Sequence, residues 1–228
     1  MTGSPLNSKL TLGLLLFVGI LPFQFNGLYN AKLSYYPLFY WLVEFITWIL
    51  FPALIYITCI KKGIFKASDI GFHTKIRGYS NKLLFIAVLI IVSIMEYPLY
   101  RLFFEHGQIL FPPDPFYISE FTYGDVVPDS GPLFYIAIVY LALSAGIVEE
   151  LYYRGLFRLL FNEGVVNSIL YVVISSVVFS SVHWEGGADN LYSTFMLGLL
   201  SSTIYVVTKN IWPIISGHIV IDYLWFSQ

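Results

Sequence analysis

Residues Val165–His183, with the sequence VVNSILYVVISSVVFSSVH, carry no formal charge before the final histidine. About 20 predominantly apolar residues are enough for an α-helix to cross the ~30 Å hydrocarbon core of a bilayer. The composition of the whole chain agrees, because 57% of its residues are hydrophobic, 11% are charged and its mean hydropathy is +0.74. A soluble domain has a charged fraction of about 25%. The sequence therefore predicts a helical integral membrane protein.

Apolar stretches on both sides of this segment extend the prediction to about seven transmembrane helices. The expected spans are residues 10–28, 37–59, 82–104, 132–161, 165–184, 190–207 and 211–227. The chain has no visible internal repeat, so we expect one all-α domain over residues 1–228, a polytopic transmembrane helical bundle. Residues 105–131, rich in proline and acidic side chains, should form an external loop and a partial lid.

The basic residues indicate how the bundle is oriented. Half of the lysines and arginines lie between the second and third spans: Lys61, Lys62, Lys66, Lys75, Arg77 and Lys82. Lysine and arginine are enriched in cytoplasmic loops, so we expect this connection in the cytoplasm and residues 105–131 on the other side. The short chain favours a bacterial plasma membrane.

The composition also argues against nucleic-acid binding and against a disulfide or a cysteine metal site. The net charge is -2 and no basic run is dense enough to follow a phosphate backbone, so we do not expect nucleic-acid binding. The single cysteine, Cys59, cannot form an internal disulfide, and its neighbours have no metal-ligand spacing. We expect it to be a small packing residue.

Three short motifs, each in a different apolar segment, carry the ionisable side chains that need explanation. They are EELYYR at residues 149–154, FSSVH at residues 179–183 and HIVID at residues 218–222. Ionisable groups at bilayer depth are costly and are rarely kept without a task or a partner. We therefore expect the three motifs to form one buried catalytic site.

The first motif contains two adjacent acids with different surroundings. On a helix Glu150 and Arg154 are i,i+4 neighbours and can form an ion pair, whereas Glu149 points about 100° away. This leaves Glu149 as the unpaired carboxylate, which suits a general base. The site requires the fourth helix to continue past Arg154 to about Phe161. If it stopped at Arg154, the cluster would lie at the cytoplasmic interface, where charges are ordinary.

The other two motifs supply histidines. His183 ends its span, and taken alone it is typical of an interfacial residue. His218 and Asp222 share one face of the last helix among β-branched apolar residues, which indicates a polar cavity or a hydrogen bond between spans. Counting about 1.5 Å per helical residue from the cytoplasmic turns places all three motifs around the middle of the hydrocarbon core, close enough to meet.

In order and spacing, the motifs resemble those of the CAAX protease and bacteriocin-processing (Abi) family of intramembrane endopeptidases, which includes the Ras-converting enzymes. The family pattern is Glu-Glu-x-x-x-Arg, then Phe-x-x-x-His, then His-x-x-x-Asn/Asp. The resemblance covers residues 140–225, the expected catalytic core of the domain. Residues 68–72, SDIGF, also look like a segment that many members carry between their early spans.

The resemblance implies an endopeptidase that hydrolyses a peptide bond of a membrane-associated peptide or lipidated protein within the bilayer. The residues matching Glu149 and His183 would activate a water, and those matching His218 and Asp222 would stabilise the oxyanion. An ionised Asp222 would repel an oxyanion, so it must be protonated or orient His218. Glu150 and Arg154 would form a supporting ion pair.

Three alternatives to a metal-free protease stay open: a zinc protease, an inactive family member and a transporter. Two histidines and a carboxylate are also a zinc ligand set, but no His-Glu-x-x-His motif is present, so we favour a mechanism without a cofactor. A catalytically idle family member could act as a membrane scaffold or immunity protein. A transporter is disfavoured because no inverted repeat is visible.

Two more acids, Glu44 and Glu96, lie within the second and third expected spans. They could be polar groups of the substrate pocket. Pairing or an interfacial position is the commoner arrangement for such residues, and we expect it here.

Overall fold

The computed structural model describes residues 5–76, 80–111 and 125–227. In these ranges the chain is helical and has no β-strand, so the all-α prediction is confirmed. The α-helices are α1 (Pro5–Gln24), α2 (Asn26–Leu33), α3 (Pro37–Phe45), α4 (Phe51–Lys61), α5 (Lys82–Leu110), α6 (Pro132–Glu149), α7 (Val165–Ser181), α8 (Gly187–Thr208) and α9 (Trp212–Phe226). Two π-helical segments, η1 (Ile46–Leu50) and η4 (Glu150–Leu156), continue α3 and α6, and two 3-10 turns, η2 (Ala67–Ile70) and η5 (Trp184–Gly186), lie in connections.

Length and hydropathy identify the membrane-spanning segments. Within the described ranges, four helical segments are long and apolar enough to cross a bilayer: Pro37–Lys61, Lys82–Leu110, Pro132–Leu156 and Trp184–Thr208. Lys9–Gln24 and Val165–Ser181 are shorter apolar helices. With α9, these segments are consistent with about seven spans, so the chain is an integral membrane protein. Leu83 and Val165 expose 80% and 77% of their surface, as side chains that face lipid do.

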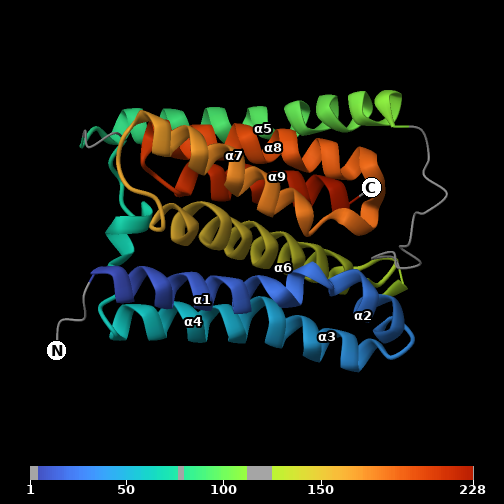
Figure 1. The fold of residues 1–228 in the computed structure, drawn as a ribbon. Coiled ribbons are helices and arrows are strands. Elements are labelled where there is room, and N and C mark those ends of the chain that lie inside the picture. Colours follow the sequence, from blue (N-terminus) through green and yellow to red (C-terminus); the bar gives the residue numbers. More distant parts are fainter. Residues whose placement is uncertain (1–4, 77–79, 112–124, 228) are drawn as a thin grey trace.

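The long helices run side by side along one axis (Figure 1). Helix α6 lies in the middle, with α1 packed against α4 on one side. On the other side α5 packs against α8 and α9, while α9 also contacts α6, and α7 contacts α8. Because α6, α7 and α9 carry the three sequence motifs, this order directs the motifs toward one interior.

The expected first span, residues 10–28, is wrong at its carboxyl-terminal end. Helix α1 ends at Gln24, and a separate helix, α2, follows it. The carboxylate of Glu185 accepts hydrogen bonds from the backbone N–H groups of Gly27 and Leu28, which satisfies donors at the start of α2. A residue far along the chain therefore stabilises the start of this helix, and no local pattern reveals it.

The expected external loop starts later than residue 105, because α5 continues to Leu110. The last turns of α5 pack on the start of α8. His106 Nδ1 lies 2.8 Å from Tyr192 Oη, and a Cβ at Gly107 would lie 2.9 Å from the carbonyl oxygen of Asp189. The end of α5 therefore lies directly against the first turns of α8. The predicted loop and partial lid cover residues 105–131, of which residues 112–124 lie outside the described residues.

The connection after α4 packs against the end of η4 and the start of α9, at the same end of the bundle (Figure 1). Ile70 is fully buried and lies against Gly155 of η4. Gly71 has a φ of +87°, and its carbonyl accepts a hydrogen bond from the N–H of Ile211 at 3.3 Å. The side chain of Asn210 donates to two carbonyls of this connection, at 2.6 and 2.8 Å. The SDIGF segment thus supports η4 and the start of α9.

Candidate functional site

The two adjacent acids lie where their helix changes type. Helix α6 ends at Glu149 and continues as the π-helix η4 to Leu156. The helical conformation therefore passes Arg154, as the predicted site requires, although it ends before Phe161. Both acids are buried within the bundle, with exposed fractions of 6% and 1%.

Helix α7 stabilises the π-helical turn from the side. The hydroxyl of Ser175 donates to the carbonyl of Tyr153 at 2.6 Å, and the hydroxyl of Tyr171 donates to the carbonyl of Arg154 at 3.2 Å. Backbone polar groups at membrane depth must find partners inside the protein, and irregular helical turns depend on neighbours for them. Short π-helical segments are often found at functional sites.

The predicted ion pair between Glu150 and Arg154 is present. Arg154 Nη1 lies 3.0 Å from Glu150 Oε1, and both side chains are almost completely buried. The guanidinium carbon of Arg154 also lies 4.1 Å from the centre of the Phe179 ring, which is a cation–π geometry. Within the described residues, no hydrogen bond with good geometry reaches a guanidinium nitrogen of Arg154. Glu150 is therefore the main compensation for this buried positive charge.

His218 lies at the centre of the ionisable cluster. Its Nδ1 is 2.8 Å from Glu150 Oε1, while its Nε2 is 3.6 Å from Glu149 Oε2 and 3.7 Å from Asp222 Oδ2. A carboxylate paired with an arginine can only accept, so Nδ1–H donates to Glu150 and Nε2 is left to face the other two acids. Glu150 thus orients His218 in addition to pairing with Arg154, which the sequence did not indicate.

A glycine permits the close approach of α6 and α9 at this point. A Cβ at Gly146 would lie 2.8 Å from Ile219 Cγ1 and 3.0 Å from the Ile219 backbone nitrogen. Small residues allow membrane helices to approach closely. Gly146 is one turn from Glu149 and Ile219 adjoins His218, so this contact sets the separation of the carboxylate and the imidazole.

His183 reaches the same interior from the end of α7. Its Nδ1 lies 3.0 Å from the carbonyl oxygen of Phe179. Because a carbonyl can only accept, Nδ1–H is the donor and Nε2 of the neutral ring carries a lone pair. The Phe179 ring packs against both histidines, with centroids 4.9 Å from His183 and 6.0 Å from His218. The aromatic residue of the second motif therefore separates and positions the two imidazoles.

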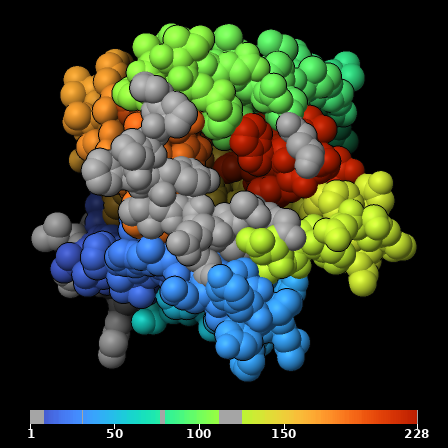
Figure 2. Space-filling model, turned by 90° about the vertical axis from the view of Figure 1, so that its right-hand side faces the viewer, coloured from blue at the N-terminus to red at the C-terminus, as the bar shows by residue number. Residues whose placement is uncertain are grey.

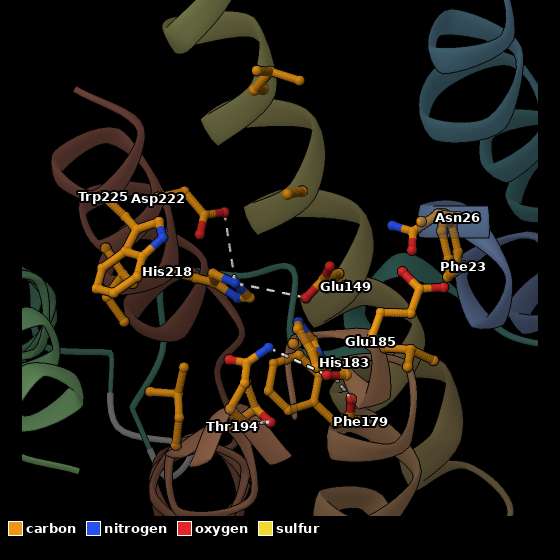
Figure 3. A pocket seen from close by; sticks show the side chains of 18 of the residues that line it. Phe23, Asn26, Glu149, Phe179, His183, Glu185, Thr194, His218, Asp222 and Trp225 are labelled. Carbon is orange, nitrogen blue, oxygen red and sulfur yellow. Dashed lines mark hydrogen bonds and ion pairs between the residues drawn. The ribbon is translucent and has the colours of Figure 1, made fainter. Parts of the chain in front are cut away.

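The four predicted catalytic residues, Glu149, His183, His218 and Asp222, line one cavity of about 490 Å³. Figure 3 shows these side chains gathered around it from α6, the end of α7 and α9. Its volume is within the roughly 300–1,000 Å³ range of ligand pockets. Glu149 Oε2 and Asp222 Oδ2 are buried and have no hydrogen-bond partner among the described residues. Both carboxylates are thus available to a ligand or a water molecule.

The cavity lies toward one end of the bundle. Its lining includes Asn26 and Gly27 at the start of α2, Phe104 near the end of α5 and Trp225 near the end of α9. These elements surround the face seen in Figure 2. The basic connection between Lys61 and Lys82 lies at the opposite end of the helices (Figure 1).

The amino-terminal wall of the cavity was not predicted. It includes Asn26 and Asn30 of α2, Glu44 of α3 and, from the later part of the chain, Glu185 of η5. The expectation that Glu44 is paired or interfacial is wrong, since it is buried, lines the cavity and has no ion pair with a described residue. A lone acid inside an apolar span was the only available signal. Glu96 is also buried, accepts a hydrogen bond from Ser201 at 3.1 Å and lies outside the cavity lining.

The zinc alternative requires at least three metal-ligating side chains that converge on one point. Among residues 5–76, 80–111 and 125–227, no group of three His, Cys, Asp or Glu side chains is placed to hold a metal ion. Cys59, buried in α4, belongs to the apolar core, as expected of a packing residue.

Sequence comparison finds a family match for the part of the chain that carries the three motifs. Residues 131–224 match the family model described as type II CAAX prenyl endopeptidase Rce1-like. This part of the chain is Rce1-like. The match contains all three motifs and confirms the resemblance to the CAAX protease family. No curated protein and no solved structure matches the chain significantly.

The matched family is described as prenyl endopeptidases, and the match covers the part of the chain from α6 to α9. The matched residues begin one residue before α6 and include Glu149, His183, His218 and Asp222. Helices α1–α5 lie before the match. The amino-terminal wall of the cavity, apart from Glu185, therefore belongs to the part of the chain that the family model does not cover.

Proposed function

We propose that this Rce1-like protein is an intramembrane endopeptidase that cleaves a membrane-associated peptide or protein precursor by water activated at Glu149 and His183. The observation that carries the proposal is the convergence of Glu149, His183 and His218 on one cavity inside the bundle. A general base needs a carboxylate oxygen that can accept a proton from the reacting water. Glu149 Oε2 is buried at the cavity, 3.6 Å from His218 Nε2, and has no hydrogen-bond partner among the described residues.

In the first step, a water is held between the carboxylate of Glu149 and the lone pair on His183 Nε2. Glu149 takes a proton from this water while the water oxygen attacks the scissile carbonyl carbon. When the C–N bond breaks, the same proton passes from Glu149 to the leaving amine. One water is consumed, and the products are a carboxylic acid and an amine.

His218 is assigned to the oxyanion that forms in the attack. Glu150 accepts from its Nδ1 at 2.8 Å, which fixes the ring and directs Nε2 toward the cavity. A protonated Nε2 can donate to the developing negative oxygen, the type of interaction that contributes most in such reactions. Asp222 Oδ2 lies 3.7 Å from Nε2, so we assign Asp222 to orienting His218 and balancing its charge.

We propose that no metal takes part, and a zinc-dependent version of the same hydrolysis is the alternative. Support comes from the described donor atoms, no three of which are arranged as a metal site. Metal analysis of the purified protein, with activity measured before and after chelation, tests this. Stoichiometric zinc whose removal abolishes cleavage would overturn the choice.

We also propose that the cavity opens on the non-cytoplasmic side of a bacterial plasma membrane. The cavity is lined by residues from α2 and from the end of α9, and both of these elements lie at the end of the bundle opposite the connection between α4 and α5 (Figure 1). If that basic connection is cytoplasmic, the substrate enters from the outer side. Cysteine labelling of an exposed residue near the start of α2, in intact cells, measures this orientation.

The proposed activity is tested by comparing the peptides released by cells that carry the wild-type protein with those from cells that carry Glu149→Ala. At equal amounts of membrane-inserted protein, the variant should lack specific cleaved fragments and accumulate their precursors. Identical peptide profiles would favour the idle scaffold and reject the protease.

A further inference from the structure

The amino-terminal wall of the cavity contains polar side chains that the proposed reaction does not use. Glu44 is only 5% exposed and Asn30 only 4%, and both line the cavity. Neither side chain has a hydrogen bond or an ion pair with any described residue. A buried carboxylate or amide without a partner is costly, so such groups are normally satisfied by protein, water or a ligand.

Glu185 adds a second carboxylate to the same wall. One of its oxygens, Oε2, lies against Gly27 at the start of α2, so closely that a side chain at Gly27 has no room. The other oxygen, Oε1, is buried and has no hydrogen-bond partner among the described residues. Figure 3 shows Glu185 and Asn26 on the side of the cavity next to His183 and Glu149. The wall is therefore continuous with the reaction site.

Acidic side chains outnumber basic ones in the cavity lining. The acidic residues are Glu44, Glu149, Glu185, Asp189 and Asp222, whereas the basic side chains among the described lining residues are His183 and His218, with no lysine or arginine. A concave site lined by one sign of charge between low-dielectric walls concentrates ligands of the opposite sign. Asparagine oxygens add hydrogen-bond acceptors that an ammonium or guanidinium group can use.

We propose that Glu44 and Asn30, with Glu185 beside them, form a subsite that binds a positively charged group of the peptide substrate. The inference rests on the proposed function, because it assigns part of the substrate to this cavity. The ligand is an ammonium or guanidinium group, carried by a lysine or arginine side chain or by a free peptide amino terminus. Its binding places the adjoining peptide bond beside Glu149 and His183.

Binding is measured in the Glu149→Gln background, so that the test does not depend on cleavage. The probes are pairs of short apolar peptides, acetylated and amidated, in which a single lysine is moved along the chain and replaced by norleucine in the twin. A third peptide has norleucine and a free amino terminus. Trp48 and Trp225 line the cavity, so tryptophan fluorescence of the protein in nanodiscs reports binding.

For at least one lysine position, or for the free amino terminus, the charged peptide should bind roughly 10-fold or more tightly than its neutral twin, as expected for a charge-assisted hydrogen bond. Adding Glu44→Gln should bring this ratio close to one. Glu96→Gln, which alters another buried carboxylate outside the cavity, should leave the ratio unchanged. Each ratio compares the affinities of the charged and the neutral peptide for the same protein preparation. Partial misfolding of a variant affects both affinities and does not remove the preference for the charged peptide.

Equal binding of charged and neutral peptides by the Glu44-containing protein would overturn the subsite. A preference that survives Glu44→Gln would overturn it as well. A preference for the lysine peptides assigns the cation to a side chain, and a preference for the free amino terminus assigns it to the peptide end. Failure of the protease itself is seen separately, as undiminished cleavage by the Glu149→Gln protein.

Discussion

Replacing Arg154 by methionine should be one of the most destabilising single changes in the protein. Arg154 is fully buried, and its Nη1 lies 3.0 Å from Glu150 Oε1. The substitution leaves the carboxylate of Glu150 in the interior without its cationic partner. Removing one member of a buried ion pair typically costs about 3–5 kcal/mol. At roughly 2–4 °C per kcal/mol for a chain of this size, the melting temperature should fall by about 10 °C.

The double variant Glu150→Leu/Arg154→Met separates stability from function. Replacing a whole buried ion pair by apolar side chains of similar volume is often neutral, so the double variant should regain most of the lost stability. It should nevertheless stay inactive, because Glu150 also orients His218 through the 2.8 Å contact to Nδ1. Thermal unfolding in detergent and peptide cleavage, measured on the same preparations, give both quantities.

The control is Arg101→Met, which removes an exposed ion pair of similar length. Arg101 Nη2 lies 3.1 Å from Glu105 Oε1, with side-chain exposures of 41% and 59%. Such a pair contributes about 0–1 kcal/mol, so the melting temperature should hardly change. The reasoning is refuted if Arg154→Met melts no earlier than Arg101→Met, or if the double variant is less stable than Arg154→Met alone.

Three further changes test other parts of the site. The cleavage rate of Asp222→Asn should stay within about 10-fold of the wild type, because asparagine still places a polar group beside His218. The cleavage rate of Asp222→Leu should fall about 100-fold, because leucine does not. Gly146→Val should lower the unfolding free energy by about 1–3 kcal/mol and reduce activity by separating α6 from α9, while Gly13→Val, where no atom lies within 4 Å of the added Cβ, should melt like the wild type. Ser175→Ala should cost about 1 kcal/mol of unfolding free energy, because it removes the 2.6 Å hydrogen bond to the π-helical turn; an unchanged melting curve would contradict that role.

Local periodicity was sufficient to predict the parts of the site that lie on one helix. The i,i+4 spacing predicted the pair of Glu150 with Arg154 and the shared face of His218 and Asp222. It could not predict that Glu150 also holds His218, because this contact depends on how α6 and α9 pack through Gly146. Tertiary contacts of this kind have no signature in either helix alone.

The remaining differences arise where distant residues determine local structure. Helix α2 starts where it does because Glu185 accepts from the N–H groups of Gly27 and Leu28. The π-helical turn after Glu149 depends on hydroxyl donors from α7, and its sequence looks like that of any α-helix. For the same reason the sequence did not predict that Glu44 lines the cavity together with residues of α2 and η5.

The most direct test of the account is the cleavage rate of purified Glu149→Gln protein in lipid bilayers, measured on a peptide that the wild type cleaves. Removing a general base while keeping the side-chain shape should lower the rate by about 10²–10⁴-fold. The melting temperature should stay near that of the wild type, since Glu149 Oε2 has no hydrogen-bond partner among the described residues. Cleavage at the wild-type rate would contradict the claim that Glu149 activates the attacking water.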